Sequence, residues 1–369
     1  MKKIVIIGAN DFQNRLILKA KDMGFETHVF AWEDGAVGKE TADCFYPVSI
    51  LEKEEILAKC RQIKPDGVCS IASDLAVLTV NYVAEALGLM CNSYAGSLFC
   101  TNKYEMRKTF DAFGIDVPKY KKVSAPLRRD ELDGMEYPLI VKPTDRSGSR
   151  SVTKVFRFED IAPAAQSAVD SSFEKACIIE EYINGDEYSC ECVSYQGSHH
   201  LLAFTKKFTT GSPNYIETRH IQPSDIPAEY QENVKGLIFK ALDALAIKNG
   251  ASHSEFKLGE DGKVRIIEIG ARMGGDCIGS DLVRLSTGYD FLRMVVDVAC
   301  GNAPDFTPVC EAKRAEIRFI LSEDDLKELE KIKSKSPNSI YRISGIDPIS
   351  PGTVSDSSMR FGYYIITDT

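Results

Sequence analysis

The 369-residue chain lacks any apolar run long enough to cross a membrane. Its first apolar run, Ile4–Ile7, is also too short for a secretory signal and ends at Gly8. The sequence lacks an excess of basic residues as well, since 45 Lys and Arg stand against 54 Asp and Glu, a formal net charge of −9. Nucleic-acid binding depends on clustered positive charge. We therefore expect neither a membrane nor a nucleic-acid partner.

The eleven cysteines include no C-x-x-C pair, a spacing found in many zinc and redox sites. Cys190 and Cys192 alternate along an expected strand, and most of the others lie in apolar runs, where a free thiol behaves as a small hydrophobic side chain. We expect reduced thiols, which are typical of a cytoplasmic protein. The chain has 44% hydrophobic residues and no internal repeat, and its length predicts two or three domains.

The first hundred residues alternate strand-like and helix-like segments. The strand Ile4–Ile7 is followed by a glycine turn and a helical pattern that ends near Gly24. Further strands are expected at 28–31 and 67–71, and helices at 50–63 and 75–87. This order predicts a parallel, doubly wound α/β domain. Only one glycine follows the first strand, so the G-x-G-x-x-G fingerprint of dinucleotide binding is absent.

Three polar side chains stand at the carboxyl ends of these strands, where ligands of such sheets bind: Asn10, Ser73 and Asp74. We expect them near a substrate. Asp74 equally suits the N-terminal cap of the helix that follows it, so its role stays open between ligand and cap.

The stretch Ser252–Gly275 predicts a β-hairpin that carries two acidic side chains. Its strands, Ala251–Leu258 and Val264–Ile269, are joined by a turn with an Asp-Gly pair. Glu255 and Glu268 then lie nearly opposite each other, and two facing carboxylates repel unless a cation lies between them. Mg²⁺ is such a cation, often held by one or two carboxylates and substrate phosphates. A surface hairpin is the alternative, but its strands are largely apolar, and a buried unpaired Glu is costly.

A second candidate feature is a lysine on an apolar strand, Tyr137–Thr144. Lys142 needs an anionic partner in such surroundings. The loop that follows it contains Ser147, Gly148, Ser149 and Ser151, small residues whose backbone N–H groups can converge on an anion. A flexible hairpin loop would have a similar composition. The adjacent Lys142 favours a phosphate site.

The segment from Cys177 to Val193 predicts a strand, a short connection and a second strand that begins with Glu187. Main-chain groups of such a connection can bond to the edge of an adenine, and Glu187 can hold two ribose hydroxyls. An ordinary half-buried strand explains the same alternation equally well.

Between residues 205 and 223 the sequence is polar, and we expect irregular structure around a short extended piece. Glu217 and His220 lie three residues apart within it. His220 is the preferred functional histidine, because His199 and His200 are expected in an exposed turn.

Six features in this order resemble the ATP-grasp superfamily, in particular its branch with carbamoyl phosphate synthase, biotin carboxylase and bacterial L-amino-acid ligases. They are Lys103 in N-K-x-x-M-R, Lys142 in I-V-K-P, the loop S-G-S-R-S-V, the run E-E-Y-I-N-G-D-E, the pair Glu255 and Glu268, and Arg272. The resemblance covers about residues 1–300. It implies an α/β and α+β fold, in which a Rossmann-like domain (1–100) precedes an ATP-grasp domain (101–300) with a mobile lid at about 115–181. A small C-terminal α+β extension (301–369) would follow.

The resemblance also implies ATP and Mg²⁺, with Mn²⁺ as an alternative, and assigns roles to individual residues. The phosphates would be contacted by Lys103, Lys142, Ser147, Gly148, Ser149 and Ser151. The adenine would be lined by Glu180, Glu181, Tyr182 and Ile183, the ribose held by Glu187, and the metal held by Glu255 and Glu268. The catalytic group would be Arg272, with Glu217 and His220, and the substrate would be approached by Asn10, Ser73, Asp74, Gly274 and Gly275. Gly270 stands where many members have an Asn ligand, which leaves one or two metal ions open.

The function implied is an ADP-forming ligase that activates a small carboxylate as an acyl phosphate for attack by an amine. A carboxylase or carbamoyl phosphate synthase-like enzyme, working through carboxyphosphate, is an alternative within the fold. A non-catalytic nucleotide-binding or regulatory subunit is an alternative of another class. The expected partners are a small-molecule carboxylate and an amine, and a homodimer stays open.

Overall fold

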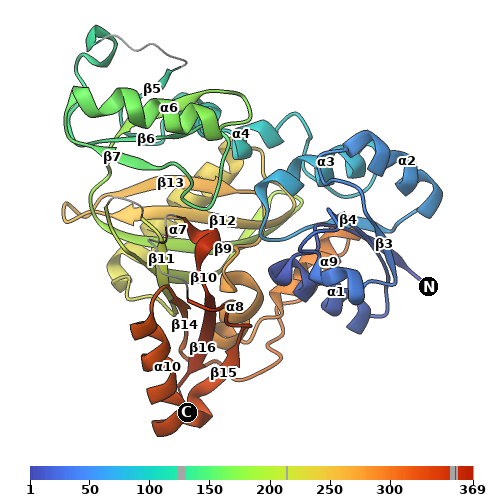
Figure 1. The fold of residues 1–369 in the computed structure, drawn as a ribbon. Helices are drawn as coiled ribbons and strands as arrows, with labels where there is room; N and C mark the ends of the chain where they lie inside the picture. The colour runs from blue at the N-terminus through green and yellow to red at the C-terminus, as the bar shows by residue number, and fades with distance from the viewer. Residues whose placement is uncertain (124–128, 213–214, 350–353, 355, 369) are drawn as a thin grey trace.

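The computed structural model describes residues 1–123, 129–212, 215–349, 354 and 356–368. Its strands form three sheets: a four-stranded N-terminal sheet, a four-stranded lid sheet and a central sheet of eight strands. In Figure 1 the lid lies above the central sheet, the N-terminal part lies to its right, and the C-terminal strands lie at the bottom. No helix in the described ranges is long and apolar enough to cross a membrane.

The N-terminal sheet is parallel and has the strand order β3-β2-β1-β4. Its strands are β1 (Lys3–Ile7), β2 (Glu26–Phe30), β3 (Cys44–Tyr46) and β4 (Gly67–Cys69). The helices between and after them are α1 (Asp11–Asp22), α2 (Lys53–Ile63) and α3 (Asp74–Leu87). The predicted parallel α/β arrangement is confirmed, and the carboxyl ends of β1 and β4 lie side by side because these strands are neighbours.

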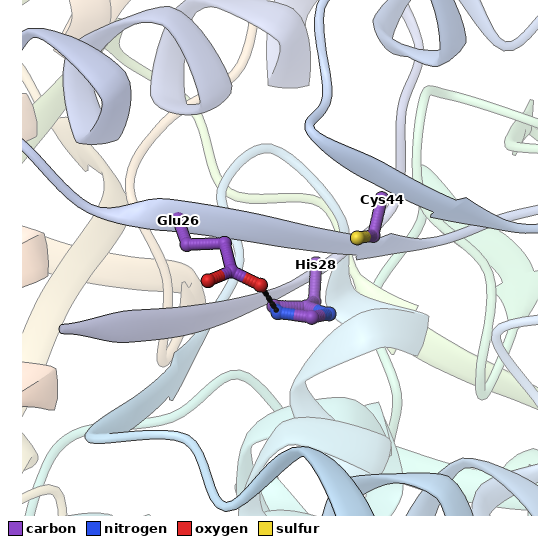
Figure 2. A group of neighbouring side chains, drawn as sticks. All are labelled: Glu26, His28 and Cys44. Atoms are coloured by element: carbon purple, nitrogen blue, oxygen red, sulfur yellow. Dashed lines mark hydrogen bonds and ion pairs between the residues drawn. The ribbon is translucent and has the colours of Figure 1, made fainter. Parts of the chain in front are cut away.

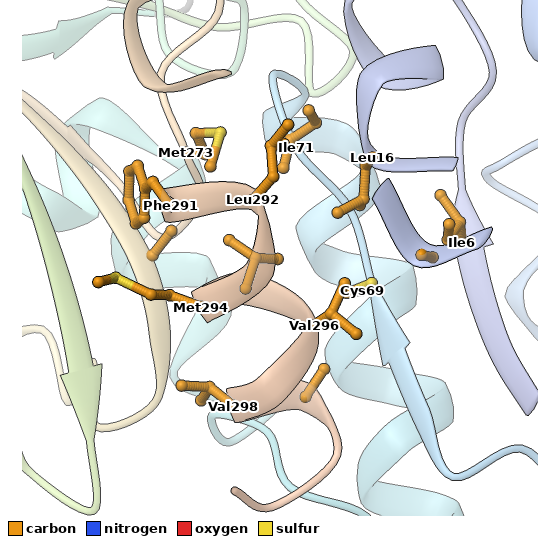
Figure 3. Close-up of a cluster of buried hydrophobic side chains, with 14 of the residues drawn as sticks. Ile6, Leu16, Cys69, Ile71, Met273, Phe291, Leu292, Met294, Val296 and Val298 are labelled. Atoms are coloured by element: carbon orange, nitrogen blue, oxygen red, sulfur yellow. The ribbon is translucent and has the colours of Figure 1, made fainter. Parts of the chain in front are cut away.

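A helix from far along the chain completes this unit. Helix α9 (Phe291–Ala299) packs against α1 and β4, and its Val296 belongs to one buried cluster with Leu16 and Cys69. Figure 3 shows its side chains interleaved with those of the N-terminal strands and α1. The N-terminal sheet therefore shares its core with residues that follow the hairpin.

The lid sheet is antiparallel and has the order β5-β8-β6-β7. It contains β5 (Tyr120–Val123), β6 (Leu139–Pro143), β7 (Thr153–Val155) and β8 (Cys177–Glu181). Helix α6 (Ile161–Ser171) packs on its outer face, and apolar residues of α6 and the strands form one core. The other face is turned toward the central sheet (Figure 1).

The central sheet runs β13-β12-β9-β10-β11-β14-β16-β15. Its strands are β9 (Asp186–Tyr195), β10 (Ser198–Thr209), β11 (Glu217–Gln222), β12 (Gly250–Leu258), β13 (Val264–Gly270), β14 (Ala315–Ile320), β15 (Ile340–Ile343) and β16 (Gly362–Thr367). The remaining α-helices are α4 (Ser97–Thr101), α5 (Lys103–Ala112), α7 (Ala228–Ala244), α8 (Val283–Thr287) and α10 (Glu323–Lys335). Since β14 pairs with β11, the C-terminal strands extend the same sheet rather than forming one of their own.

Two local expectations were wrong. The polar stretch expected to be largely irregular contains the end of β10 and the whole of β11, because both strands pair with neighbours on two sides. His199 lies on β10 and not in a turn, and its ring contacts Ser194 and Asp243, so its side chain is nearly buried. Residues 213–214 of this stretch lie outside the described residues.

Candidate active site

A cleft lies between the lid sheet and the central sheet. It is lined by β6, the end of β8, the loop after β6, and the hairpin β12–β13. Expected site residues that line it are Lys142, Ser147, Gly148, Ser149, Glu180, Glu181, Tyr182, Ile183, Glu187, Glu217, Glu255, Glu268 and Arg272. The fold thus brings together residues that span 130 positions of sequence.

The hairpin pairs its two acids as the sequence predicted, with Glu255 directly opposite Glu268 in the register. Each carboxylate has a cationic partner. Glu255 forms an ion pair with Lys207, and Glu268 lies 3.0 Å from Nζ of Lys103. Burial alone would raise the pKa of Glu255, but Lys207 and His253 outweigh it and hold the pKa well below its usual range. Glu255 is therefore an anion at neutral pH.

Sequence reasoning missed two buried side chains beside Glu255. Lys207 on β10 is nearly buried, and the rule that a buried lysine needs an anion, applied to Lys142, would have found it. His253 on β12 bonds to Glu191 through Nδ1, and its Nε2 lies 3.2 Å from Glu255. Burial would lower the pKa of His253, but Glu191 raises it to about 9, so the ring donates from both nitrogens. The sequence offered no comparable signal for Glu191, which is fully buried.

Lys142 belongs to a buried group of three charges. Its ammonium group pairs with Glu180, and Nε of Arg107 lies 3.0 Å from the same carboxylate. Burial would raise the pKa of Glu180, but Arg107 and Lys142 outweigh burial and lower it to about 2. Arg107 also donates to the carbonyl of Ile267 at 2.8 Å and so ties the lid to β13. The expected anionic partner of Lys142 is present, and it comes from the protein.

The loop after β6 contains three residues with a left-handed backbone conformation. Gly148, Ser149 and Ser151 have φ values of 73°, 56° and 51°, in the left-handed region that anion-binding turns often use. Nζ of Lys103 donates to the carbonyl of Arg146 at 2.7 Å, which holds the start of the loop against Glu268. Ser151 itself does not line the cleft, and its hydroxyl lies 2.6 Å from that of Ser171.

At the opposite end of the cleft, two lysines contact Tyr182 in the connection that follows β8. Nζ of Lys154 lies 3.4 Å from the centre of the Tyr182 ring, and Lys257 donates to its hydroxyl at 3.2 Å. Glu187 lies 3.7 Å from Nζ of Lys207, yet burial raises the pKa of this carboxyl above its ordinary value. This end combines an aromatic ring, main-chain groups and one acid.

Arg272 is fixed by two hydrogen bonds to Asp74, at 2.9 and 3.0 Å, so α3 meets the segment that follows β13 at this pair. Burial would raise the pKa of Asp74, but Arg272 outweighs it and lowers the pKa. A Cβ at Gly270 would lie 2.7 Å from Oδ1 of Asp74. A side chain at position 270 would therefore displace the carboxylate of Asp74 from its place beside Arg272.

Several expected residues have structural partners outside the cleft. Asn10 caps α1 in a capping box with Gln13, and Ser73 caps α3, so Asp74 is not the cap. His220 is fully buried, and its Nε2 lies 3.4 Å from Asp276, whose carboxylate is held by Arg360. Gly274 donates its N–H to Glu191 at 3.0 Å, and Gly275 follows it. Their roles near a substrate stay predictions.

Among the described residues, one group of three metal-ligating side chains lies within 4.8 Å of one another: Glu26, His28 and Cys44. It lies on β2 and β3 of the N-terminal sheet (Figure 2). Nε2 of His28 lies 2.9 Å from Glu26 and Nδ1 lies 3.0 Å from the hydroxyl of Tyr46. Both ring nitrogens already have hydrogen-bond partners, and this group is remote in the fold from the cleft.

The comparisons with known proteins agree with this geometry. Residues 135–281 match the ATP-grasp domain family, and the expected resemblance is confirmed over that segment. Alanine–anticapsin ligase of Bacillus subtilis strain 168 is 25% identical over 270 residues, which cover 67% of this chain and 56% of that ligase. The chain therefore spans little more than half the length of this relative.

Two solved structures cover the whole chain. The L-amino acid ligase from Bacillus licheniformis has a TM-score of 0.80 at 22% identity over 93% of its own chain. The ADP complex of N5-carboxyaminoimidazole ribonucleotide synthetase has a TM-score of 0.79 at 16% identity over 92% of its chain. These likenesses show that the whole chain has the same fold as these two enzymes.

Proposed function

We propose, from the match of residues 135–281 to the ATP-grasp domain family, that the protein is an ADP-forming ligase. It would activate a small carboxylate with ATP and join it to an amine. The observation that carries the proposal is the register of the hairpin. Glu255 and Glu268 lie side by side on paired strands at the wall of a cleft that Lys142 and the loop after β6 also line. The relatives named above are ligases and a synthetase of small molecules, and the proposed substrates belong to the same class.

The chain's own residues supply the contacts that such a reaction needs. Lys142 and Lys103 would contact the phosphates, and the loop of Ser147 to Ser151 would cover them. Asp74 holds Nε and Nη2 of Arg272, and Nη1 donates one N–H to the carbonyl of Met273 at 3.4 Å. The second N–H of Nη1 would face the negative charge that develops as the carboxylate attacks phosphorus. Because these groups are fixed before the substrate arrives, they need little reorganisation during the reaction.

The residues present fit a magnesium ion. Two neighbouring carboxylates are hard oxygen ligands, and Glu255 is ionised, as a metal ligand must be. A bound ion would share these carboxylates with Lys207 and Lys103. Glu255 and Glu268 would hold the ion, which when bound supplies positive charge beside the transferred phosphate. Gly270 offers no third ligand, and the space beside it is taken by Asp74.

A cytoplasmic location is part of the proposal, because all eleven cysteines are free thiols. The assembly state stays open between a monomer and a homodimer.

The test is ADP release from ATP in a screen of carboxylates, with and without Mg²⁺. For an active carboxylate, Glu268→Gln should reduce ADP release about a hundredfold or more, since an amide is a weaker ligand and carries no charge. Circular dichroism should show an intact fold. Glu260→Gln is the matched control, because Glu260 is exposed in the turn of the same hairpin, and it should act like the wild type. An active Glu268→Gln variant would show the metal assignment to be wrong, and nucleotide binding without ADP release would favour the non-catalytic alternative.

A further inference from the structure

A second space opens beside the cleft, between α3 and α4 on one side and the lid on the other, with a volume of about 500 Å³. Its wall is mainly apolar, and the apolar side chains come from four segments of the chain. The apolar side chains are Leu51, Leu75, Leu78, Leu98 and Phe173. We call this space the leucine groove. Leu51, Leu98 and Phe173 are 44%, 54% and 52% exposed. Apolar side chains gathered in one groove favour a ligand with an apolar part.

At the polar end of the leucine groove the acids already have partners, and two arginines have no ion pair among the described residues. Its four acids are all engaged: Glu268 by Lys103, Asp74 by Arg272, Glu174 by Asn102 and Lys122, and Asp145 by the N–H groups of residues 173 and 174. Arg146 and Arg150 also lie at this end, and neither forms an ion pair within the part of the chain that the structure describes. Nε of Arg146 is buried without a hydrogen-bond partner. Such guanidinium groups favour a carboxylate or a phosphate.

The leucine groove adjoins the cleft. Arg146, Ser147, Arg150 and Glu268 line both spaces. A carboxylate held at the shared arginines would thus lie next to the proposed phosphate and metal contacts, while the group attached to it would extend along the leucines.

We infer that the leucine groove selects the carboxylate that is activated, and that this substrate carries an apolar side chain. The inference rests on the ligase function proposed above. Arg146 and Arg150 would hold the carboxylate, whose oxygen would form a bond to the γ-phosphorus of ATP as the bond to ADP breaks. The side chain would pack against Leu51, Leu78 and Leu98.

Hydroxylamine allows this to be tested without the natural amine, because it displaces phosphate from an acyl phosphate and gives a hydroxamate, phosphate and a proton. Hydroxamate formation would be measured with ATP and Mg²⁺ for straight-chain acids from acetate to octanoate, and for α-amino acids from glycine to norleucine. In at least one series kcat/KM should rise about fourfold per methylene, up to the length of the groove.

The double variant Leu51→Gln, Leu98→Gln should cost little stability, because both side chains are already half exposed. The double variant should lower kcat/KM tenfold or more for the longest acids. The kcat/KM for short acids and the KM for ATP should stay unchanged. Leu18→Gln is the matched control, since Leu18 is 44% exposed on α1 and outside both spaces. A length-independent kcat/KM in both series, or an equal loss for short and long acids, would overturn the inference.

Calorimetry would measure the binding of octanoate and norleucine without ATP. Binding tests the leucine groove alone, whereas hydroxamate formation also requires the proposed ligase function. Binding that the double variant loses and Leu18→Gln keeps would support the leucine groove even if no hydroxamate formed, and only the ligase function would then fail. Absence of both binding and hydroxamate would overturn the inference.

Discussion

At the scale of single residues, the site is a set of charges that are already paired. Lys142 has Glu180, Lys103 has Glu268, and Lys207 has Glu255. Buried charges without partners are costly, so these ion pairs stabilise the folded cleft. The pair with Glu180 differs from the others, because Arg107 binds the same carboxylate.

Glu180→Gln should therefore destabilise the protein by about 3–5 kcal/mol at pH 7, because it leaves two buried cations without an anion. The pKa of Glu180 falls from an ordinary 4.5 to about 2 on folding, so its contribution is fully present above pH 4.5 and is lost as pH falls toward 2. Urea unfolding midpoints of wild type and variant should converge over that window.

The control is Glu159→Gln on the same lid, since Glu159 is 62% exposed and pairs with Arg129 at the surface. An exposed pair contributes about 1 kcal/mol or less. A difference between Glu180→Gln and the wild type that stays constant from pH 5 to pH 2 would contradict the assigned pKa.

At the scale of elements, the segment after β13 packs against two strands of the central sheet. Gly274 donates its N–H to Glu191 on β9, and Glu191 in turn bonds to His253 on β12. A Cβ at Gly274 would lie 2.7 Å from Glu191 and 2.8 Å from His253. At Gly275 the nearest atom would be 3.6 Å away, on Ala72. These neighbouring glycines thus form a matched pair for substitution.

Gly274→Ala should lower ADP release about tenfold to a hundredfold, because displacing the carboxylate loses a hydrogen bond to a charged group and shifts His253 away from Glu255. Gly275→Ala should stay within about twofold of the wild type. The two variants would be compared by their steady-state ADP release. Circular dichroism would check that both are folded. Equal effects of the two substitutions would show that this packing does not act on the site.

At the scale of the whole molecule, the three parts share cores. Helix α9 closes the N-terminal sheet, and β14 continues the central sheet beyond β11. Buried residues of β14 and β16 also cover Cys277, Ile278 and Leu282, which follow the hairpin. The C-terminal strands therefore stabilise the region that carries the site, even though they do not line the cleft.

A chain truncated after Cys300 should lose its cooperative fold. It would expose the edge of β11 and the apolar side chains of residues 277, 278 and 282, at about 2 kcal/mol for each side chain. This loss is a large part of the stability of a typical domain, which is about 5–15 kcal/mol. Soluble yield, size-exclusion behaviour and a urea midpoint would measure it. A truncated chain with the wild-type midpoint would show that the extension is independent of the site.

The sequence by itself determined the features that depend on near neighbours along the chain. The alternation of strands and helices predicted the parallel N-terminal sheet, and the Asp-Gly turn predicted the register that places Glu255 opposite Glu268. Apolar runs also marked Lys142 as a lysine in need of an anion. These predictions succeed because turn geometry and burial act over a few residues.

Only the tertiary structure decided which distant residues complete the site. Glu191, Lys207 and His253 come together because β9, β10 and β12 are adjacent in the sheet, although 62 residues separate the first from the last. In the same way, Asp74 bonds to Arg272, although 198 residues separate them in the sequence. An oxygen of Asp74 occupies the space that a side chain at position 270 would need. The hairpin that the sequence marks as a metal site is therefore held in its charge state by strands that pair with it only in the folded protein.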